Sequence, residues 1–326
     1  MSNKHDFKER PIFTKELWDS FEYRVVMGGM GDDTAMMIAE LYERGFEPDE
    51  IVFCDTGSEF PHTYEFITHL QKWCIERKWS KVVILKKLDK YNQPLSVISM
   101  CHSQRTLPAA AFGSKSCSLR FKVETADKYF NNHQECWKAW GVDKPRPITK
   151  MYENSIGIIG WETKVGKGTP IKQHTGKILR LVGINFDEPK RIEGWKNEPK
   201  WTQAFPLFDN EIGEAESEAV ERVGLYYPGK SSCTVCPYLT HGEVHMLYTD
   251  YRHLYDDSIV MQNNWREDNL IISAQDDLFG DDSFDNTVLG LGGRNGKTRE
   301  QMLKEYQANP QHYKQSTNKK PCECGH

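Results

Sequence analysis

Short apolar runs and longer amphipathic stretches alternate along the first part of the chain. The apolar runs are rich in β-branched residues and predict strands at 24–27, 51–54 and 81–85. Apolar residues at helical spacing between these runs predict helices at 33–44 and 61–77. Strands that alternate with helices at this spacing favour a parallel sheet covered by helices on both faces. The predicted fold class is therefore α/β, with a doubly wound parallel sheet.

The later part of the chain gives weaker patterns. They predict a basic, irregular segment at 99–122, a helix at 123–140, a Gly- and Lys-rich hairpin or loop at 151–177, a strand at 177–184, an acidic helix at 213–224 and a solvated acidic loop at 276–285. The predicted boundaries are an N-terminal lead at 1–20, a nucleotide-binding α/β domain at 21–215, a cysteine-bearing helical extension at 216–265, and an acidic loop with a polar tail at 266–326.

Composition narrows the classes of protein that this chain can belong to. The 326 residues are enough for one large or two modest domains, and the net charge of −5 gives no global basic field for nucleic acid. No apolar run reaches the length of a membrane span, and the first residues are polar rather than signal-like. We expect a cytoplasmic protein with no membrane partner, whose nine cysteines are thiols, metal ligands or catalytic groups.

A glycine cluster follows the first predicted strand. Gly28, Gly29 and Gly31 precede Asp32, Asp33 and Thr34, and a helix begins there. Backbone amides at the start of a helix bind phosphate, and glycines let a phosphate approach the backbone closely. The loop lacks the Gly-Lys-Ser/Thr ending of a Walker motif and the spacing of a dinucleotide fingerprint. The alternative to a phosphate site is a tight turn between strand and helix.

An acid follows the second predicted strand and strengthens the case for a site. Asp55, Thr56 and Gly57 come directly after the run at 51–54. In open parallel sheets, ligands bind beyond the carboxyl ends of the strands. The sequence therefore predicts one site in which the glycine loop holds a phosphate chain while Asp55 holds Mg²⁺ or a ribose hydroxyl.

These motifs resemble those of the PP-loop ATP pyrophosphatases, within the adenine nucleotide alpha hydrolase superfamily. The similarity is greater to the phosphoadenosine phosphosulfate (PAPS) reductase-like branch, which carries a Ser-Gly-Gly-Gly-x-Asp-Ser-Thr-Ala type of loop and then a strand ending in Asp-Thr-Gly. The similar blocks occur in the same order: VMGGMGDDTAMM at 26–37, GFEPDEIVFCDTGSEFPHTYEFI at 45–67, KSCSLRFKVE at 115–124, LVGINFDEPKR at 181–191, FPLFD at 205–209 and GLYYPGKSSCTVCPY at 224–238.

The resemblance implies an ATP or related adenine-nucleotide site with Mg²⁺. It implies nucleotide contacts from the residues Gly28, Gly29, Gly31, Asp33, Thr34, Asp55, Thr56, Gly57, Asp187 and Arg191, and catalytic roles for Asp32, Asp33, Asp55, Arg120 and Lys122. The chain departs from the family pattern where Met27 replaces the first loop serine and Asp33 replaces the serine before Thr34. Carboxylates repel phosphates unless a metal bridges them. These departures bear on ATP hydrolysis more than on the fold.

Two cysteines at 233 and 236 form a C-x-x-C motif. Such a pair can hold a metal ion or act as a redox dithiol. A closed metal site needs further ligands, and the resemblance implies Cys117 as the third. Cys101 is the first candidate for the fourth ligand, and His102 and His241 are the next candidates. The metal would be Zn²⁺, or an iron–sulfur cluster if all four ligands are cysteines. The alternative is a set of partly buried thiols.

Other groups permit a site but also have simpler structural explanations. Cys322, Cys324 and His326 resemble both a metal-binding run and the Glu-Cys-Gly tail of sulfonucleotide reductases. A cationic cluster around Cys117 is either an anion site or a solvated loop; its members are Arg105, Lys115, Arg120 and Lys122. Base stacking is possible for Trp195 and Trp201, but packing is favoured. A structural role is favoured for His241 and His245.

The leading hypothesis is an enzyme that cleaves ATP between the α and β phosphates. It would adenylate an acceptor, either a nucleic acid or a small molecule, for thiolation or a related modification, with a sulfur carrier as a possible partner. One alternative is a sulfonucleotide reductase that uses a cysteine thiolate. Another is a non-catalytic module that binds nucleic acid or protein through a degenerate loop. The family also suggests a bacterial or phage modification or defence system. A homo-oligomer is compatible with the sequence.

Overall fold

The computed structural model describes most of the chain and divides it into two compact units. It describes residues 10–89, 91, 93–112, 114, 116–141, 149–153, 158–164, 178–193, 200–213, 218–279, 290–291 and 297–314. The first unit comprises Met1–Cys54, Pro61–Leu85 and Ala126–Ser231, and the second comprises Asp55–Phe60, Lys86–Thr125 and Ser232–His326. The units interleave along the sequence.

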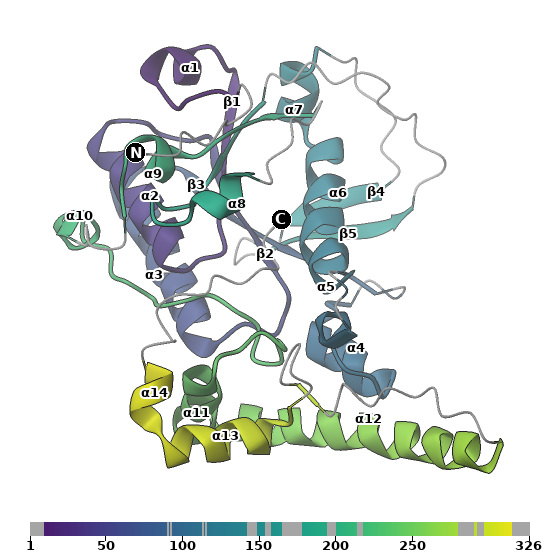
Figure 1. Cartoon of the computed structure of the whole chain (residues 1–326). Coiled ribbons are helices and arrows are strands. Elements are labelled where there is room, and N and C mark those ends of the chain that lie inside the picture. Colours follow the sequence, from purple (N-terminus) through teal and green to yellow (C-terminus); the bar gives the residue numbers. More distant parts are fainter. Residues whose placement is uncertain are drawn as a thin grey trace. The chain divides into compact units, whose positions relative to one another are not determined.

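A seven-stranded sheet forms the centre of the first unit (Figure 1). Its strand order is β4-β5-β3-β2-β1-β6-β7. The bounds are Tyr23–Met27 for β1, Glu50–Asp55 for β2, Lys81–Lys86 for β3, Thr149–Glu153 for β4, Ile158–Lys164 for β5, Ile178–Val182 for β6 and Thr202–Ala204 for β7. The pairings β1–β2, β1–β6, β6–β7 and β3–β5 are parallel, whereas β4 and β5 form an antiparallel hairpin. The predicted parallel α/β sheet is confirmed, with this hairpin at one edge.

Helices lie on both faces of the sheet (Figure 1). On one face lie α2 (Asp32–Glu43) and α3 (Pro61–Arg77), which match the predicted helices closely. The other face carries α6 (Glu124–Asn132) and α7 (Gln134–Ala139). The remaining helices of this unit are short: α1 (Lys15–Asp19), α8 (Pro189–Glu193), α9 (Pro206–Asp209) and α10 (Glu218–Arg222). The main core cluster joins α2 and α3 to the sheet through fully buried side chains such as Val26, Ile38, Phe66 and Leu179.

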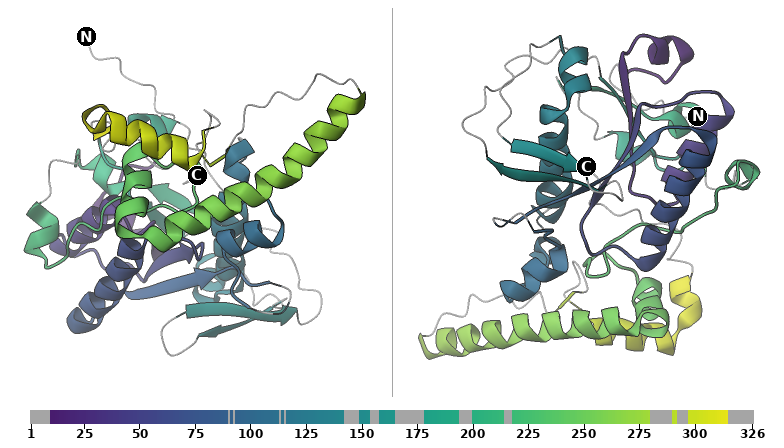
Figure 2. Two further views of the ribbon diagram at one scale, coloured as in Figure 1. Left: turned by 90° about the horizontal axis from the view of Figure 1, so that it is seen from below. Right: turned by 180° about the vertical axis from the view of Figure 1, so that it is seen from behind.

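The second unit is mainly helical. Its elements are α4 (Val97–Ser103), a 3₁₀ turn (Ala109–Phe112), α5 (Ser116–Ser118), a π-helix (Leu119–Val123), α11 (His241–Asp250), α12 (Arg252–Phe279), α13 (Arg299–Ala308) and α14 (Pro310–Lys314). The longest of these elements, α12, has 28 residues, and Figure 2 shows it as one unbroken helix. None of the described helices is long and apolar enough to cross a membrane.

Several sequence-based expectations about elements were wrong. The segment 99–122 is largely helical, and the single helix expected at 123–140 breaks at His133. Residues 276–279, expected in a loop, are the end of α12. Within the described part of 213–224, only Glu218–Arg222 is helical.

Two other expectations about elements were right. The hairpin expected within 151–177 is present as β4 and β5, and the strand expected at 177–184 is β6.

Candidate functional site

The glycine loop joins β1 to α2 and is held by bonds to its surroundings. The amide of Gly28 donates to the carbonyl oxygen of Val52 on β2 at 3.1 Å. Met30 is fully buried with φ of +61°, and its amide donates to the Thr34 hydroxyl at 3.2 Å. Gly31 is the N-cap residue of α2, although it has no side chain with which to cap. The loop therefore has a fixed backbone at the carboxyl end of β1.

Close packing explains why the loop needs its glycines. A Cβ on Gly28 would lie 2.7 Å from the Thr34 methyl group, and a Cβ on Gly31 would lie 2.8 Å from the amide nitrogen of Ser231. On Gly29 it would lie 2.9 Å from the Ser231 hydroxyl oxygen. These distances are shorter than ordinary van der Waals contact. The glycines thus have a packing role that needs no ligand, so they do not identify a phosphate site by themselves.

The loop's amide groups make the stronger case for an anion site. Within the described part of the chain, the backbone amides of Gly29, Gly31 and Asp33 have no hydrogen-bond partner. The amide of Asp32, by contrast, donates to the Gly229 carbonyl oxygen at 3.2 Å. Unpaired amides at the positive end of a helix are suited to bind an anion. The three amides belong to the loop's last residues and the start of α2.

Asp32 and Asp33 are neighbours in sequence but have different surroundings. The Asp32 carboxylate accepts a 2.7 Å bond from the Gly229 amide, so Asp32 and Gly229 are joined by two hydrogen bonds. Burial raises the pKa of Asp32, while the Gly229 bond and nearby His62 oppose that rise. Asp32 therefore fastens the segment 229–231 to the start of α2, and this contact accounts for its side chain.

The Asp33 carboxylate points to the end of β6. It accepts a 3.2 Å bond from the Asn185 side-chain amide and lies 3.5 Å from the Arg191 guanidinium, which also pairs with Glu188. Burial raises the pKa of Asp33 to about 6; Glu188 adds to this rise, and Arg191 and Asn185 oppose it. One arginine thus compensates two carboxylates, and the pKa of Asp33 stays above its usual value despite this pairing.

The structure separates the other residues predicted around this loop. Arg191 lies beside the loop as predicted, but the Asp187 carboxylate lies against Gly213, with Oδ2 only 2.5 Å from where a Cβ on Gly213 would be. Asn185 was not singled out in the sequence. Its position three residues after the end of β6 could have indicated a role at the strand ends, where ligands bind in parallel sheets.

In the second unit, the Asp55 side chain is buried and makes an ion pair. Its Oδ2 atom lies 2.9 Å from the Lys86 ammonium, and its Oδ1 atom accepts a 2.6 Å bond from the Gly57 amide. Gly57 has φ of +68°, and a Cβ there would lie 2.6 Å from the Ser96 Cβ. The sequence analysis did not identify Lys86. A lysine at the end of one strand carries no sequence signal that it pairs with an acid at the end of the preceding strand.

Thr56 connects this loop to the C-x-x-C motif. Its hydroxyl donates to the Glu59 carboxylate at 2.9 Å and lies 3.0 Å from the Cys233 sulfur. The Cys233 thiol also lies 3.7 Å from the same Glu59 oxygen. Thr56 and Glu59 are both buried, so the Cys233 thiol rests on an internal polar pair.

The predicted metal ligands are distributed over different surroundings. Cys236 packs in an apolar cluster with Phe60, while Cys101 is in a second cluster with Phe121. Burial raises the pKa of Cys101 to about 12, and nearby Cys117 adds to the rise. Among the described residues, no three His, Cys, Asp or Glu side chains are grouped so that they could hold one metal ion. The zinc or iron–sulfur site therefore remains a sequence prediction.

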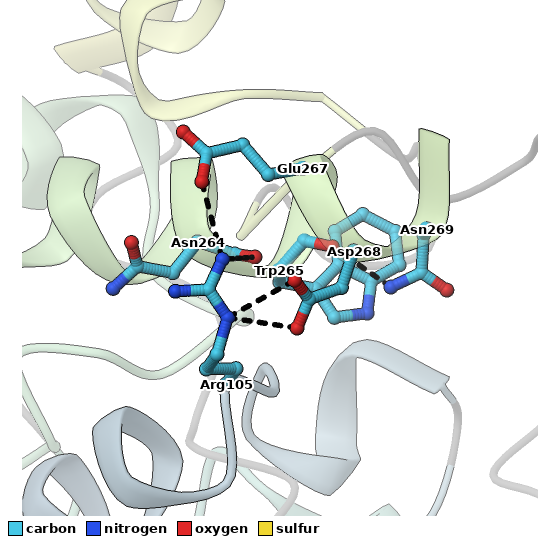
Figure 3. Close-up of polar contacts among 6 residues, drawn as sticks. All are labelled: Arg105, Asn264, Trp265, Glu267, Asp268 and Asn269. Atoms are coloured by element: carbon cyan, nitrogen blue, oxygen red, sulfur yellow. Dashed lines mark hydrogen bonds and ion pairs between the residues drawn. The ribbon is translucent and has the colours of Figure 1, made fainter. Parts of the chain in front are cut away.

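The predicted cationic cluster is largely occupied by internal contacts. Arg105 pairs with Glu267 and Asp268 of α12 and also donates to the Asn264 carbonyl (Figure 3). The Arg120 guanidinium lies 3.8 Å from the Met100 sulfur, and Lys122, in the same π-helix, also has a partner. Arg105 thus joins the end of α4 to α12 and is not placed to bind an external anion.

The remaining candidates have structural contacts or lie outside the described residues. His241 pairs with Glu305 at 2.8 Å and stacks on Tyr313, and His245 stacks on Tyr306, as a structural role requires. Trp201 is buried, and the Arg180 guanidinium lies 4.9 Å from its ring. The predicted residues outside the description are Lys115, Trp195, Cys322, Cys324 and His326.

No protein-family model matches this chain, and no curated protein matches it.

Proposed function

We propose that this protein is an adenine-nucleotide-binding enzyme of the PP-loop, PAPS reductase-like type. In this proposal the glycine loop binds the phosphates of ATP, and cleavage between the α and β phosphates adenylates an acceptor for thiolation or a related modification. The observation that carries it is the set of amides at Gly29, Gly31 and Asp33, which lack partners among the described residues at the start of α2. The parallel α/β fold, with this loop directly after a central strand, supports the proposal.

The two loop acids are compatible with an anionic ligand. Asp32 accepts a hydrogen bond from the Gly229 amide, which offsets part of the cost of burying its charge. The Asp33 carboxylate lies beside the Arg191 guanidinium, which offsets its negative charge. The repulsion expected from the sequence is therefore weaker than two exposed carboxylates would produce.

Mg²⁺ fits this arrangement better than a metal that needs many protein ligands. Mg²⁺ commonly takes one or two carboxylates together with phosphate oxygens and water. Asp33 is the carboxylate at the loop that would take this role, and the metal would neutralise charge on the triphosphate. Catalytic roles for Asp55, Arg120 and Lys122 stay predictions that mutation must test.

The acceptor substrate and the cellular system in which the enzyme acts are part of the same proposal. A nucleic acid, a small molecule or a sulfur carrier would complete the reaction in the cytoplasm, within a bacterial or phage modification or defence system.

Calorimetric titration with ATP and Mg²⁺ tests the proposal, with Gly29→Asp as the informative variant. Gly29 is exposed, and its backbone conformation suits any residue, so only the Ser231 hydroxyl has to move. A carboxylate placed beside the free amides should weaken ATP binding at least about tenfold, because like charges repel at short range. Glu22→Asp, at an exposed position before β1, is the matched control and should bind as the unmodified protein does.

The outcomes separate the candidate functions. Binding of ATP together with formation of AMP and pyrophosphate, lost in Asp55→Asn, supports the enzyme. Binding without cleavage supports the non-catalytic module. Preference for a sulfonucleotide over ATP supports the reductase. Failure of all of these nucleotides to bind at millimolar concentration, with the protein folded, refutes the proposed site.

A further inference from the structure

The Cys233–Cys236 motif forms a tight turn in the second unit. The Cys236 amide donates to the Cys233 carbonyl oxygen at 3.0 Å, which closes the turn over Thr234 and Val235. In such a turn the first and fourth Cα atoms lie within about 7 Å, and disulfides span Cα distances of about 4.4–6.8 Å. The backbone therefore already places the two cysteines at a separation that one disulfide can bridge.

The neighbouring backbone holds Cys233 in a fixed position. Cys233 forms an isolated antiparallel bridge with Glu59. On either side of it, the Phe60 amide donates to the Ser232 carbonyl at 3.1 Å, and the Thr234 amide donates to the Ser58 carbonyl at 2.8 Å. The Cys233 side chain is only partly buried, whereas Cys236 is 7% exposed. An accessible first cysteine and a covered second cysteine suit stepwise thiol–disulfide exchange.

A buried arginine supports the second cysteine. Arg299 is fully buried, and its Nη2 atom donates to the Cys236 carbonyl oxygen at 2.7 Å. Within the described structure, its Nε and Nη1 atoms have no hydrogen-bond partner. A buried cation with unpaired donors is costly unless negative charge lies nearby. The Cys236 sulfur, the buried Glu243 carboxylate and Tyr255 all interact electrostatically with this guanidinium, and Cys236 is the one of them that belongs to the C-x-x-C motif.

The N-terminal cap of α13 keeps Arg299 at this position. Thr298 and Gln301 form a reciprocal capping box, and the Arg299 amide donates to the Gln262 side chain at 3.1 Å. The backbone of Arg299 is therefore held by its own helix, and its guanidinium reaches the cysteine turn from there. The position of Arg299 is therefore evidence that does not depend on the spacing of the two cysteines.

We propose that Cys233 and Cys236 form a reversible dithiol–disulfide couple, with Cys233 as the entry thiol and Arg299 as the residue that favours the reduced form. The partner is an organic disulfide such as oxidised glutathione. The Cys233 sulfur attacks it, forms a mixed disulfide and releases one thiol. The Cys236 sulfur then attacks the Cys233 sulfur, forms the internal disulfide and releases the second thiol. The two cysteines lose two electrons and two protons, which the organic disulfide gains.

This couple is independent of the proposed nucleotide site. Equilibration of the full-length, metal-free protein with reduced and oxidised glutathione, followed by alkylation and peptide mass spectrometry, tests it directly. The expected result is one disulfide linking residues 233 and 236 at a defined glutathione ratio. Cys236→Ser should instead accumulate a mixed disulfide between glutathione and Cys233. The matched control is Cys74→Ser, which changes a buried thiol of the first unit and should leave the couple intact.

Arg299→Gln tests the role of the buried charge. Losing the cation should shift the equilibrium toward the disulfide about tenfold, which corresponds to about 30 mV for two electrons. Arg299→Lys keeps the charge and should stay closer to the unmodified protein, so the pair of variants separates charge from packing. If either variant fails to fold, the Cys236→Ser trap still decides the proposal.

Two results would overturn the inference. One is the absence of any internal disulfide even in fully oxidised glutathione. The other is zinc or iron that co-purifies at one site per chain, blocks alkylation of both cysteines and is lost in Cys233→Ser. The second result would restore the metal centre predicted from the sequence.

Discussion

At the scale of single residues, surroundings decide what a side chain can do. Asp32 and Asp33 are adjacent and chemically identical, yet one binds the Gly229 amide while the other faces Arg191 and Asn185. The sequence predicted two acids that repel a phosphate. It could not show that each has its own partner, because those partners come from segments about 150 and 200 residues away.

Asp33→Asn tests the raised pKa of Asp33 through the pH dependence of stability. The folded pKa of about 6 lies above the usual 3.8, so the unfolded chain loses its proton first as pH rises. The unmodified protein therefore loses stability between about pH 4 and pH 6, and the variant does not. We expect the difference in unfolding free energy between the variant and the unmodified protein to change by about 2 kcal/mol across this pH range. The Asp33 side chain is 30% exposed, so solvent screening makes this change smaller than the full pKa shift would give.

Urea unfolding at pH 4 and pH 7.5 measures this difference. The control is Glu188→Gln, which removes a neighbouring charge and should lower the pKa of Asp33 without abolishing its titration. A constant difference between Asp33→Asn and the unmodified protein at both pH values would contradict the raised pKa.

At the scale of elements, the segment 99–122 shows why composition misleads. Its basic and small residues suggested irregular structure, but Ser96 forms a capping box with Ser99 that starts α4. Val97 and Cys101 of α4 are buried in one cluster with Phe121 of the π-helix. Short helices with few apolar residues give little periodicity in sequence, and tertiary packing supplies most of their stability.

Gly57→Ala tests how tightly the loop after β2 packs on the start of α4. Gly57 has φ of +68°, and the new Cβ would lie 2.6 Å from the Ser96 Cβ, so strain and a steric clash add. We expect a loss of about 3 kcal/mol in unfolding free energy.

Gly45→Ala is the matched control because Gly45 has φ of +73° with no atom within 4 Å of the added Cβ. It should lose only about 1 kcal/mol, from backbone strain alone. Equal losses for the two variants in chemical denaturation would show that the contact with Ser96 adds nothing.

At the scale of the whole molecule, one buried carboxylate ties the first unit together across several elements. Glu50 at the start of β2 accepts hydroxyl bonds from Tyr23 of β1 at 2.7 Å and Tyr129 of α6 at 2.5 Å. Its other oxygen lies 3.4 Å from His133, where α6 ends and α7 begins. The break in the predicted helix at 123–140 therefore coincides with its attachment to the sheet.

Glu50→Ala should destabilise the first unit strongly. The variant removes the acceptor of two buried hydroxyl bonds and the partner of His133, so we expect a loss of about 3 kcal/mol in unfolding free energy. The exposed Glu22→Ala should change it by less than about 0.5 kcal/mol. Thermal unfolding followed by tryptophan fluorescence compares the two, and similar midpoints would refute the role of this cluster.

The sequence by itself determined the alternation of strands and helices, the bounds of α2 and α3, and the position of the glycine loop after the first strand. These features depend on local periodicity and on the conformations of glycine and proline, which neighbouring residues reveal. Only the tertiary structure decided which partner each polar residue has. Lys86 for Asp55, Asn185 for Asp33 and Arg299 for the Cys236 turn are side-chain contacts, and hydrophobic patterning does not encode which polar groups meet once the core closes.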